Sequence, residues 1–104
     1  MLERIIPSTK KSLPVIGLGT SRVFDIKPTT ELLAIRQNIL DILLDNGGTL
    51  IDTSPMYGKS EEIIGRLIET YDRKKEFFLA TKVWARGKSE GEHQIKESFR
   101  KMHT

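Results

Sequence analysis

Three side chains with complementary acid–base chemistry follow two apolar segments of this chain. Asp52 ends the run TLID, Tyr57 follows five positions later, and Lys82 interrupts the apolar segment EFFLATKVW. Free tyrosine and free lysine both titrate at about pH 10, so a phenol exchanges protons near neutrality only beside a cation that stabilises its anion. Lys82 would be that cation, and Asp52 would hold the ammonium in place. We therefore expect Tyr57 to donate a proton to a carbonyl oxygen while another group delivers hydride to the carbon.

Each of these residues also has a purely structural interpretation. An aspartate after a strand is often a turn or cap residue, and Tyr57 could be a phenol at the edge of the core. Lys82 is harder to explain in this way, because lysine is rarely buried without a partner. Trp84 lies two positions after Lys82, on the same side of an extended chain, and could serve either packing or a substrate pocket. Only a common location of the acid, the phenol and the ammonium would favour catalysis over these alternatives.

The apolar pattern predicts the elements that would position these residues. ERIIP and LPVIG, joined by STKKS, predict an N-terminal hairpin. The chain then runs through Gly17 and Gly19, which predicts a strand end whose backbone lies close to a packed neighbour or to a ligand.

Three pairs of strand and helix complete the predicted order. A helix begins at about Thr30 and stops at the glycines 47–48, the strand TLID follows, and a second helix begins at about Glu61 with Ser60 as its N-cap. EFFLATKVW predicts a third strand covered on both faces, and a last helix begins at about Ser89. The apolar stripe of that last helix is Ile95, Phe99 and Met102. Such alternation predicts parallel strands with right-handed crossovers, and it leaves a sheet edge open.

The carboxyl ends of parallel strands lie on one side of a sheet, so loops from successive strands meet there. One rim would receive residues from three strand ends: Gly19, Thr20 and Ser21 from the first, Asp52 and Tyr57 from the second, and Lys82 and Trp84 from the third. The two histidines fall on the last helix and are assigned no role. No histidines or carboxylates have the spacing of metal ligands, so no metal site is predicted.

Composition narrows the class of protein. A length of 104 residues with 38% hydrophobic content suits one domain, and 17 basic against 14 acidic side chains are intermixed, which does not indicate nucleic acid as a partner. The densest charged run, DRKKE at 72–76, is interpreted as a solvated turn, with a phosphate contact as the alternative. There is no cysteine for a disulfide, and no segment has the pattern of a signal peptide or a membrane span. We therefore expect a cytoplasmic protein.

Three ordered blocks of the sequence have the character of a known family. LPVIGLGT, GGTLIDTSPMYGKSEEIIG and FFLATKVW resemble the first three barrel strands, with the loop after the second, of the aldo/keto reductases. The resemblance runs over essentially all 104 residues. It implies an α/β fold consisting of an N-terminal hairpin and the first three βα units of a (β/α)8 TIM barrel. Residues 1–104 would then be the N-terminal part of a single barrel domain, an incomplete barrel.

This resemblance also implies an activity, in which hydride passes from NADPH, or alternatively from NADH, to a small aldehyde or ketone. The family's catalytic aspartate, tyrosine and lysine match Asp52, Tyr57 and Lys82. The resemblance further implies contacts with the cofactor by Gly19, Thr20, Ser21 and Asp52, and contacts with the substrate by Trp84 and Tyr57. Ser21 stands where many members carry an aromatic residue.

The sequence ends before the fourth strand, which carries the family's catalytic histidine, and before the loops that hold the cofactor phosphates. We therefore expect the 104-residue chain alone to be an inactive fragment, because a nicotinamide without phosphate anchors binds weakly. The alternative is a non-catalytic interaction module on the same scaffold, which pairs with another chain or a second copy through its open sheet edge. A flavodoxin-type nucleotide-binding domain is disfavoured, because GTSRVFDIKPTT lacks the glycines or the Lys-Ser/Thr ending of a phosphate loop.

Overall fold

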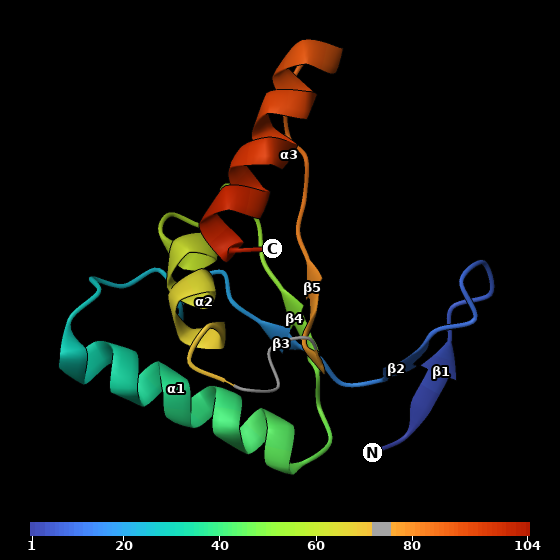
Figure 1. The fold of residues 1–104 in the computed structure, drawn as a ribbon, viewed down its shortest axis with the longest axis vertical. Coiled ribbons are helices and arrows are strands. Elements are labelled where there is room, and N and C mark those ends of the chain that lie inside the picture. The colour runs from blue at the N-terminus through green and yellow to red at the C-terminus, as the bar shows by residue number, and fades with distance from the viewer. Residues whose placement is uncertain (72–75) are drawn as a thin grey trace.

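The computed structural model describes residues 1–71 and 76–104, and its elements follow the predicted order (Figure 1). The predicted turn DRKKE lies outside the described residues except for Glu76. The strands are β1 (Glu3–Ile5), β2 (Ser12–Pro14), β3 (Leu18–Gly19), β4 (Leu50–Asp52) and β5 (Phe78–Ala80). The helices are α1 (Thr30–Asp45), α2 (Ser60–Ile68) and α3 (Lys88–Met102).

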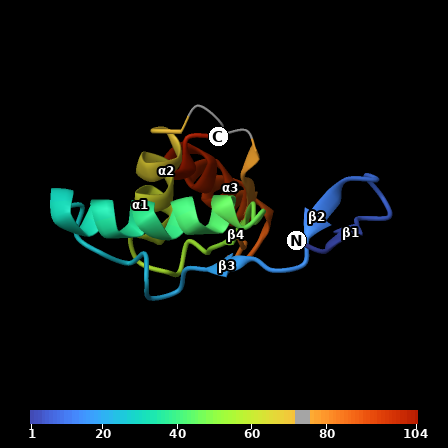
Figure 2. The ribbon, with the colours of Figure 1, turned by 90° about the horizontal axis from the view of Figure 1, so that it is seen from below.

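The strands form two separate sheets. β1 and β2 pair antiparallel as the predicted hairpin, which projects to one side of the remaining structure (Figure 2). The other sheet has the order β3-β4-β5, and both of its pairings are parallel, as predicted. Its register places Gly19 of β3 opposite Asp52 of β4, and Asp52 opposite Ala80 of β5. The three strands therefore end together, on the side where the predicted site residues follow.

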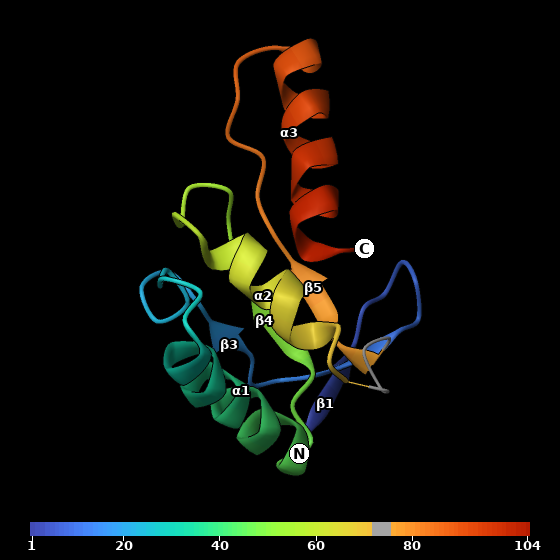
Figure 3. The same ribbon diagram turned by 60° about the vertical axis from the view of Figure 1, so that its left-hand side comes forward.

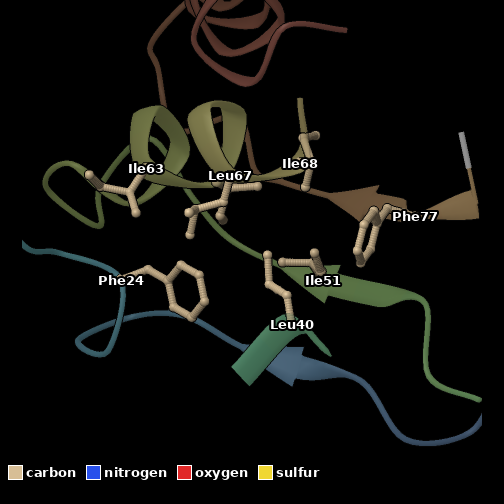
Figure 4. Close-up of a cluster of buried hydrophobic side chains, with 8 residues drawn as sticks. Phe24, Leu40, Ile51, Ile63, Leu67, Ile68 and Phe77 are labelled. Atoms are coloured by element: carbon tan, nitrogen blue, oxygen red, sulfur yellow. The ribbon is translucent and has the colours of Figure 1, made fainter. Parts of the chain in front are cut away.

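The hydrophobic core lies between this sheet and the helices α1 and α2 (Figure 4). Ile51, in the middle of the central strand, has no exposed surface. The other buried members are Phe24, Leu40, Ile63, Ile64, Leu67, Ile68 and Phe77. α2 supplies half of the cluster because its apolar residues recur at helical spacing on the face toward the sheet. This core fixes α2, and hence the loop that precedes it, against the ends of the strands.

The start of α2 differs from the prediction. Ser60 is the first helical residue rather than the N-cap, and Lys59 occupies the cap position without a side-chain cap bond. The Lys59 N–H instead donates to Asp25 Oδ1 at 3.0 Å, across 34 positions of sequence. A Cβ at Gly58 would lie 2.3 Å from the same Asp25 oxygen, and φ there is +55°, so the close approach of this loop requires glycine. Ser60 is thereby left free to point into the interior.

The third parallel strand, β5, is much shorter than the strand predicted over the segment EFFLATKVW. Only Phe78–Ala80 is strand, so the prediction that Lys82 and Trp84 lie within the strand is wrong. The reason is that β4 ends at Asp52, opposite Ala80. The residues after Asp52 form a loop, so β5 has no neighbouring strand with which to continue its backbone hydrogen bonds. Figure 3 shows the chain after β5 running alongside α3 before it turns back into that helix.

α3 packs closely on α2. A Cβ at Gly65 would lie 2.1 Å from the main-chain oxygen of Lys101, so the two helix backbones meet there. Of the predicted apolar stripe only Met102 is buried, at 2% exposure, whereas Ile95 and Phe99 are 40% and 53% exposed. One face of α3 is therefore not covered by the described residues. None of the helices in the described part of the chain has the length and apolar character needed to cross a membrane.

Candidate active site

Lys82 and Asp52 form the centre of the site. The Lys82 ammonium donates to Asp52 Oδ1 at 3.1 Å, to Asp52 Oδ2 at 3.0 Å and to the main-chain oxygen of Thr53 at 2.8 Å. The ammonium therefore has three oxygen acceptors within hydrogen-bond distance. Asp52 is the last residue of β4, and Lys82 lies two residues beyond β5, so the parallel pairing brings them together.

Tyr57 lies at the same place, in the loop between β4 and α2. The Lys82 nitrogen is 4.9 Å from the centre of the Tyr57 ring, within the range of a cation–π contact. Consecutive turns order this loop, because Tyr57 N–H donates to Ser54 O and Ser60 N–H donates to Tyr57 O, both at 3.0 Å. The structure thus brings together the acid, the phenol and the ammonium that the sequence singled out.

The electrostatics of Lys82 suit a lasting positive charge beside the phenol. Partial burial lowers the pKa of Lys82, but the attraction of the Asp52 and Tyr57 side chains outweighs it, so the pKa is raised overall. The side chains of Lys82 and Asp52 are 45% and 50% exposed, and an ion pair with that exposure adds little to the stability of the fold. The pair nevertheless places a charged ammonium 4.9 Å from the centre of the Tyr57 ring.

The turn after β3 borders this group. Gly19 and Ser21 are exposed, and a Cβ at Gly19 would meet nothing within 4 Å, so the backbone there faces open space. Gly17 is different, because a Cβ there would lie 2.9 Å from Leu50 Cδ2. A packed neighbour therefore explains Gly17, while the space beside Gly19 can admit a ligand. Thr20, between the two exposed residues, is completely buried.

A group of buried hydroxyls behind the site was not recognised in the sequence. Thr20, Thr53 and Ser60 have no exposed surface and are bonded to one another. Thr20 Oγ1 also donates to the main-chain oxygen of Asp52 at 2.8 Å. The available signal was weak: a threonine directly after Asp52 and a serine at the start of a helix each have common local explanations.

Trp84 lies apart from the acid–phenol–ammonium group. Its side chain is 70% exposed and lines a cavity of about 590 Å³, together with Pro55, Glu61, His93, Gln94 and Lys101. The Gln94 amide holds the Trp84 main chain by accepting from its N–H and donating to its oxygen. Asp52, Tyr57 and Lys82 do not line this cavity.

The two histidines are not part of the acid–phenol–ammonium group. His93 lines the same cavity as Trp84, and His103 Nδ1 lies 2.6 Å from Glu69 Oε1. Among the described residues, no three histidine or carboxylate side chains gather as a metal would require.

Comparison with known sequences confirms the resemblance to the aldo/keto reductases that three blocks of the sequence indicated. The model of the aldo/keto reductase family matches residues 15–104. The aldo-keto reductase YhdN of Bacillus subtilis is 54% identical over 71 residues, covering 64% of this chain and 21% of that protein. The aldo-keto reductase yakc [NADP(+)] of Schizosaccharomyces pombe is 39% identical over 83 residues, covering 74% and 24%. The chain thus spans about a quarter or less of the length of these relatives.

Solved structures agree over the whole chain. A Pseudomonas aeruginosa protein assigned to the aldo-keto reductases superimposes with a TM-score of 0.82 and 25% identity, over 99% of this chain and 42% of its own. The aldo-keto reductase of Klebsiella pneumoniae, solved in complex with NADPH, gives 0.75 and 26%, over 100% of this chain and 37% of its own. Since the family model covers most of the sequence and the fold agrees throughout, this chain belongs to the aldo/keto reductase family.

Proposed function

We propose that this chain supplies the proton-donating part of an oxidoreductase that reduces an aldehyde or ketone with NADPH. The observation that carries the proposal is the position of the Lys82 ammonium, which binds the Asp52 carboxylate and lies against the Tyr57 ring. A phenol beside a fixed cation can donate its proton to a carbonyl oxygen, because the cation stabilises the phenolate that forms.

The proton transfer follows from these positions. A carbonyl oxygen beside the Tyr57 hydroxyl would receive its proton, and the ammonium of Lys82 would stabilise the phenolate that remains. Asp52 keeps the ammonium charged and in place through both carboxylate oxygens. The hydride for the carbonyl carbon would come from a reduced nicotinamide when one is bound, and the product would be an alcohol. A proton from water then restores Tyr57.

The residues present are compatible with one side of a nicotinamide. The open space at Gly19 and the exposure of Ser21 would let a flat ring approach the turn after β3, next to Asp52. The resemblance implied a cofactor contact for Thr20, and we propose that this residue acts by holding the turn, because its hydroxyl is buried and donates to the main-chain oxygen of Asp52. Trp84 stays proposed as a substrate contact, in a pocket that would extend from Tyr57 to the separate cavity that Trp84 and Pro55 line. NADP is preferred to NAD because one curated relative carries NADP(+) in its name and one solved relative contains NADPH.

The full activity is proposed to require further βα units. With 104 residues against relatives several times longer, the isolated chain is expected to show no turnover. A chimera tests the catalytic assignment: residues 1–104 replace the corresponding part of YhdN, and aldehyde-dependent loss of NADPH fluorescence is followed. Tyr57→Phe should abolish turnover and preserve NADPH binding, whereas Tyr71→Phe should preserve both. A folded chimera whose turnover is insensitive to Tyr57→Phe would refute the proton-donor role.

A second function is favoured by one specific observation, the groove along β5. β5 is one of the two outer strands of its sheet, and beside it lies a hollow of about 480 Å³ lined in part by Phe78, Leu79, Phe99 and Met102. An apolar groove next to a sheet edge suits the addition of a strand from another chain or a second copy. Concentration-dependent oligomers in sedimentation velocity, abolished by Phe99→Lys, would support this interaction module. A monomer at all concentrations would contradict it.

A further inference from the structure

A buried line of hydroxyls runs behind the proposed proton donor. Thr53 Oγ1 lies 2.9 Å from Ser60 Oγ, which lies 2.9 Å from Thr20 Oγ1, which in turn lies 2.8 Å from the main-chain oxygen of Asp52. All three hydroxyl residues are completely buried. No water can replace a lost partner without rearrangement at such a place, so the bonds depend on one another.

The direction of this line follows from the number of hydrogens. Each hydroxyl has one proton to donate. Thr20 gives its proton to the Asp52 oxygen, and Ser60 gives its proton to Thr20 Oγ1. Ser60 can therefore only accept from Thr53, although the geometry of that pair alone would allow either direction. All hydrogen bonds in the line of hydroxyls therefore run in one direction, from Thr53 through Ser60 and Thr20 to the Asp52 carbonyl.

This line of hydroxyls joins three segments that are far apart in the sequence. Ser60 opens α2 and lies 40 positions from Thr20, which follows β3, while Thr53 follows directly after Asp52. The line of hydroxyls thus begins on the side chain of Thr53 and ends on the main-chain oxygen of Asp52, and both residues bind Lys82 through other atoms. Lys82 uses the side chain of Asp52 and the main-chain oxygen of Thr53. Whatever holds Asp52 and Thr53 in their mutual orientation also sets the position of the ammonium.

We propose that Ser60, through Thr20 and Thr53, is a positioning residue that fixes the Lys82 ammonium beneath the Tyr57 ring. The consequence for catalysis rests on the proposed function, but the positioning itself does not. The simpler interpretation is that the three hydroxyls only satisfy one another in a buried place. That interpretation predicts a loss of stability in variants and no specific change at Lys82.

The test measures hydrogen exchange of the lysine ammonium groups by NMR in the 104-residue chain, without cofactor or substrate. The Lys82 signal is identified by its loss in Lys82→Arg. In the unsubstituted chain it should exchange more slowly than that of Lys88, whose side chain is 89% exposed. Ser60→Ala should accelerate exchange at Lys82 by about fivefold, the factor that corresponds to the net free energy of one hydrogen bond.

Matched variants separate positioning from general loosening. Thr20→Val removes the donor to Asp52 at nearly constant shape and should also accelerate Lys82 exchange, whereas Thr20→Ser keeps the hydroxyl and should restore the slow rate. Tyr71→Phe, which removes bonds to Asp41 and Gln37 away from the site, should leave the rate unchanged.

Thr20→Val also serves as the decisive variant if Ser60→Ala does not fold. An unchanged Lys82 rate in folded Thr20→Val, or an equal acceleration in Tyr71→Phe, would overturn the proposal. An inactive chimera with altered Lys82 exchange would refute the proposed function and leave the positioning role in place.

Discussion

The ammonium of Lys82 donates to both carboxylate oxygens of Asp52, although the two residues are 30 positions apart in sequence. Their main chains are brought together by the pairing of β4 with β5, whose register ends at Asp52 and Ala80. The ion pair therefore depends on where two strands end, and Tyr57 reaches it from the loop that follows one of them. The chemistry of the site and the topology of the sheet are thus tied to the same few residues.

The raised pKa of Lys82 predicts a definite dependence of stability on pH. A cation whose folded-state pKa exceeds its unfolded value stabilises the fold fully below the unfolded value, and this contribution is lost as pH rises through the folded value. The stability difference between the unsubstituted chain and Lys82→Met, which is expected to be small for so exposed a pair, should therefore be constant through neutral pH. It should shrink above the ordinary lysine pKa of 10.5. Urea unfolding at a series of alkaline pH values measures this difference. Lys88→Met, at an exposed pair with Glu92, is the control, and a Lys82 difference that stays constant at high pH would contradict the assignment.

The contact of α2 with α3 predicts opposite effects at two helical glycines. Gly65→Ala places a Cβ 2.1 Å from the Lys101 main-chain oxygen, so the helices must move apart, at a cost of about 1–3 kcal/mol. At Gly91 a Cβ would make an ordinary contact, 3.5 Å from Val83 Cγ1, and alanine there should stabilise by about 0.5–1 kcal/mol because glycine is a poor helix former. Chemical denaturation of both variants shows whether each substitution lowers or raises the free energy of unfolding. Equal effects at the two positions would argue against the close helix contact.

Asp25 is predicted to act as the cap of α2 in place of Ser60. Asp25→Ala removes the acceptor of the Lys59 N–H and should lower the free energy of unfolding by about 1 kcal/mol. Asp45→Ala is a suitable control, because an acid in the last turn of α1 opposes the helix dipole, and its removal should be neutral or slightly stabilising. Thermal unfolding would show whether the two aspartates differ. The idea fails if Asp25→Ala is as stable as the unsubstituted chain.

The central strand should be the most sensitive part of the core. Ile51→Ala leaves a void between the sheet and α2 at a completely buried position and is expected to cost about 2–5 kcal/mol. Ile42→Ala makes the same chemical change on α1, where the side chain is 62% exposed, and should stay within about 0.5 kcal/mol. Urea titrations compare the pair directly. A small effect at Ile51 would mean that the sheet is not packed as described.

Local pattern was sufficient to predict the order of elements and the residues of the site. Apolar spacing indicated the hairpin and the alternation of strand and helix, because periodicity depends only on near neighbours. A lysine within an apolar segment and an aspartate at the end of another led to the expectation of a shared rim, since parallel strands end on one side. That expectation was confirmed for Asp52, Tyr57 and Lys82, while their catalytic roles stay predictions.

The sequence by itself determined which segments are strands and helices and which side chains could carry the chemistry. Only the tertiary structure decided which of them touch. It buried Thr20 against Ser60, bonded the Lys59 N–H at the start of α2 to Asp25, ended β5 at Ala80 and placed Trp84 on a separate cavity. These outcomes depend on contacts between residues ten to forty positions apart, which arise from how loops cross once the core has formed. Such crossings leave no periodic signal in the chain, because they are set by the packing of whole elements rather than by the preferences of neighbouring residues.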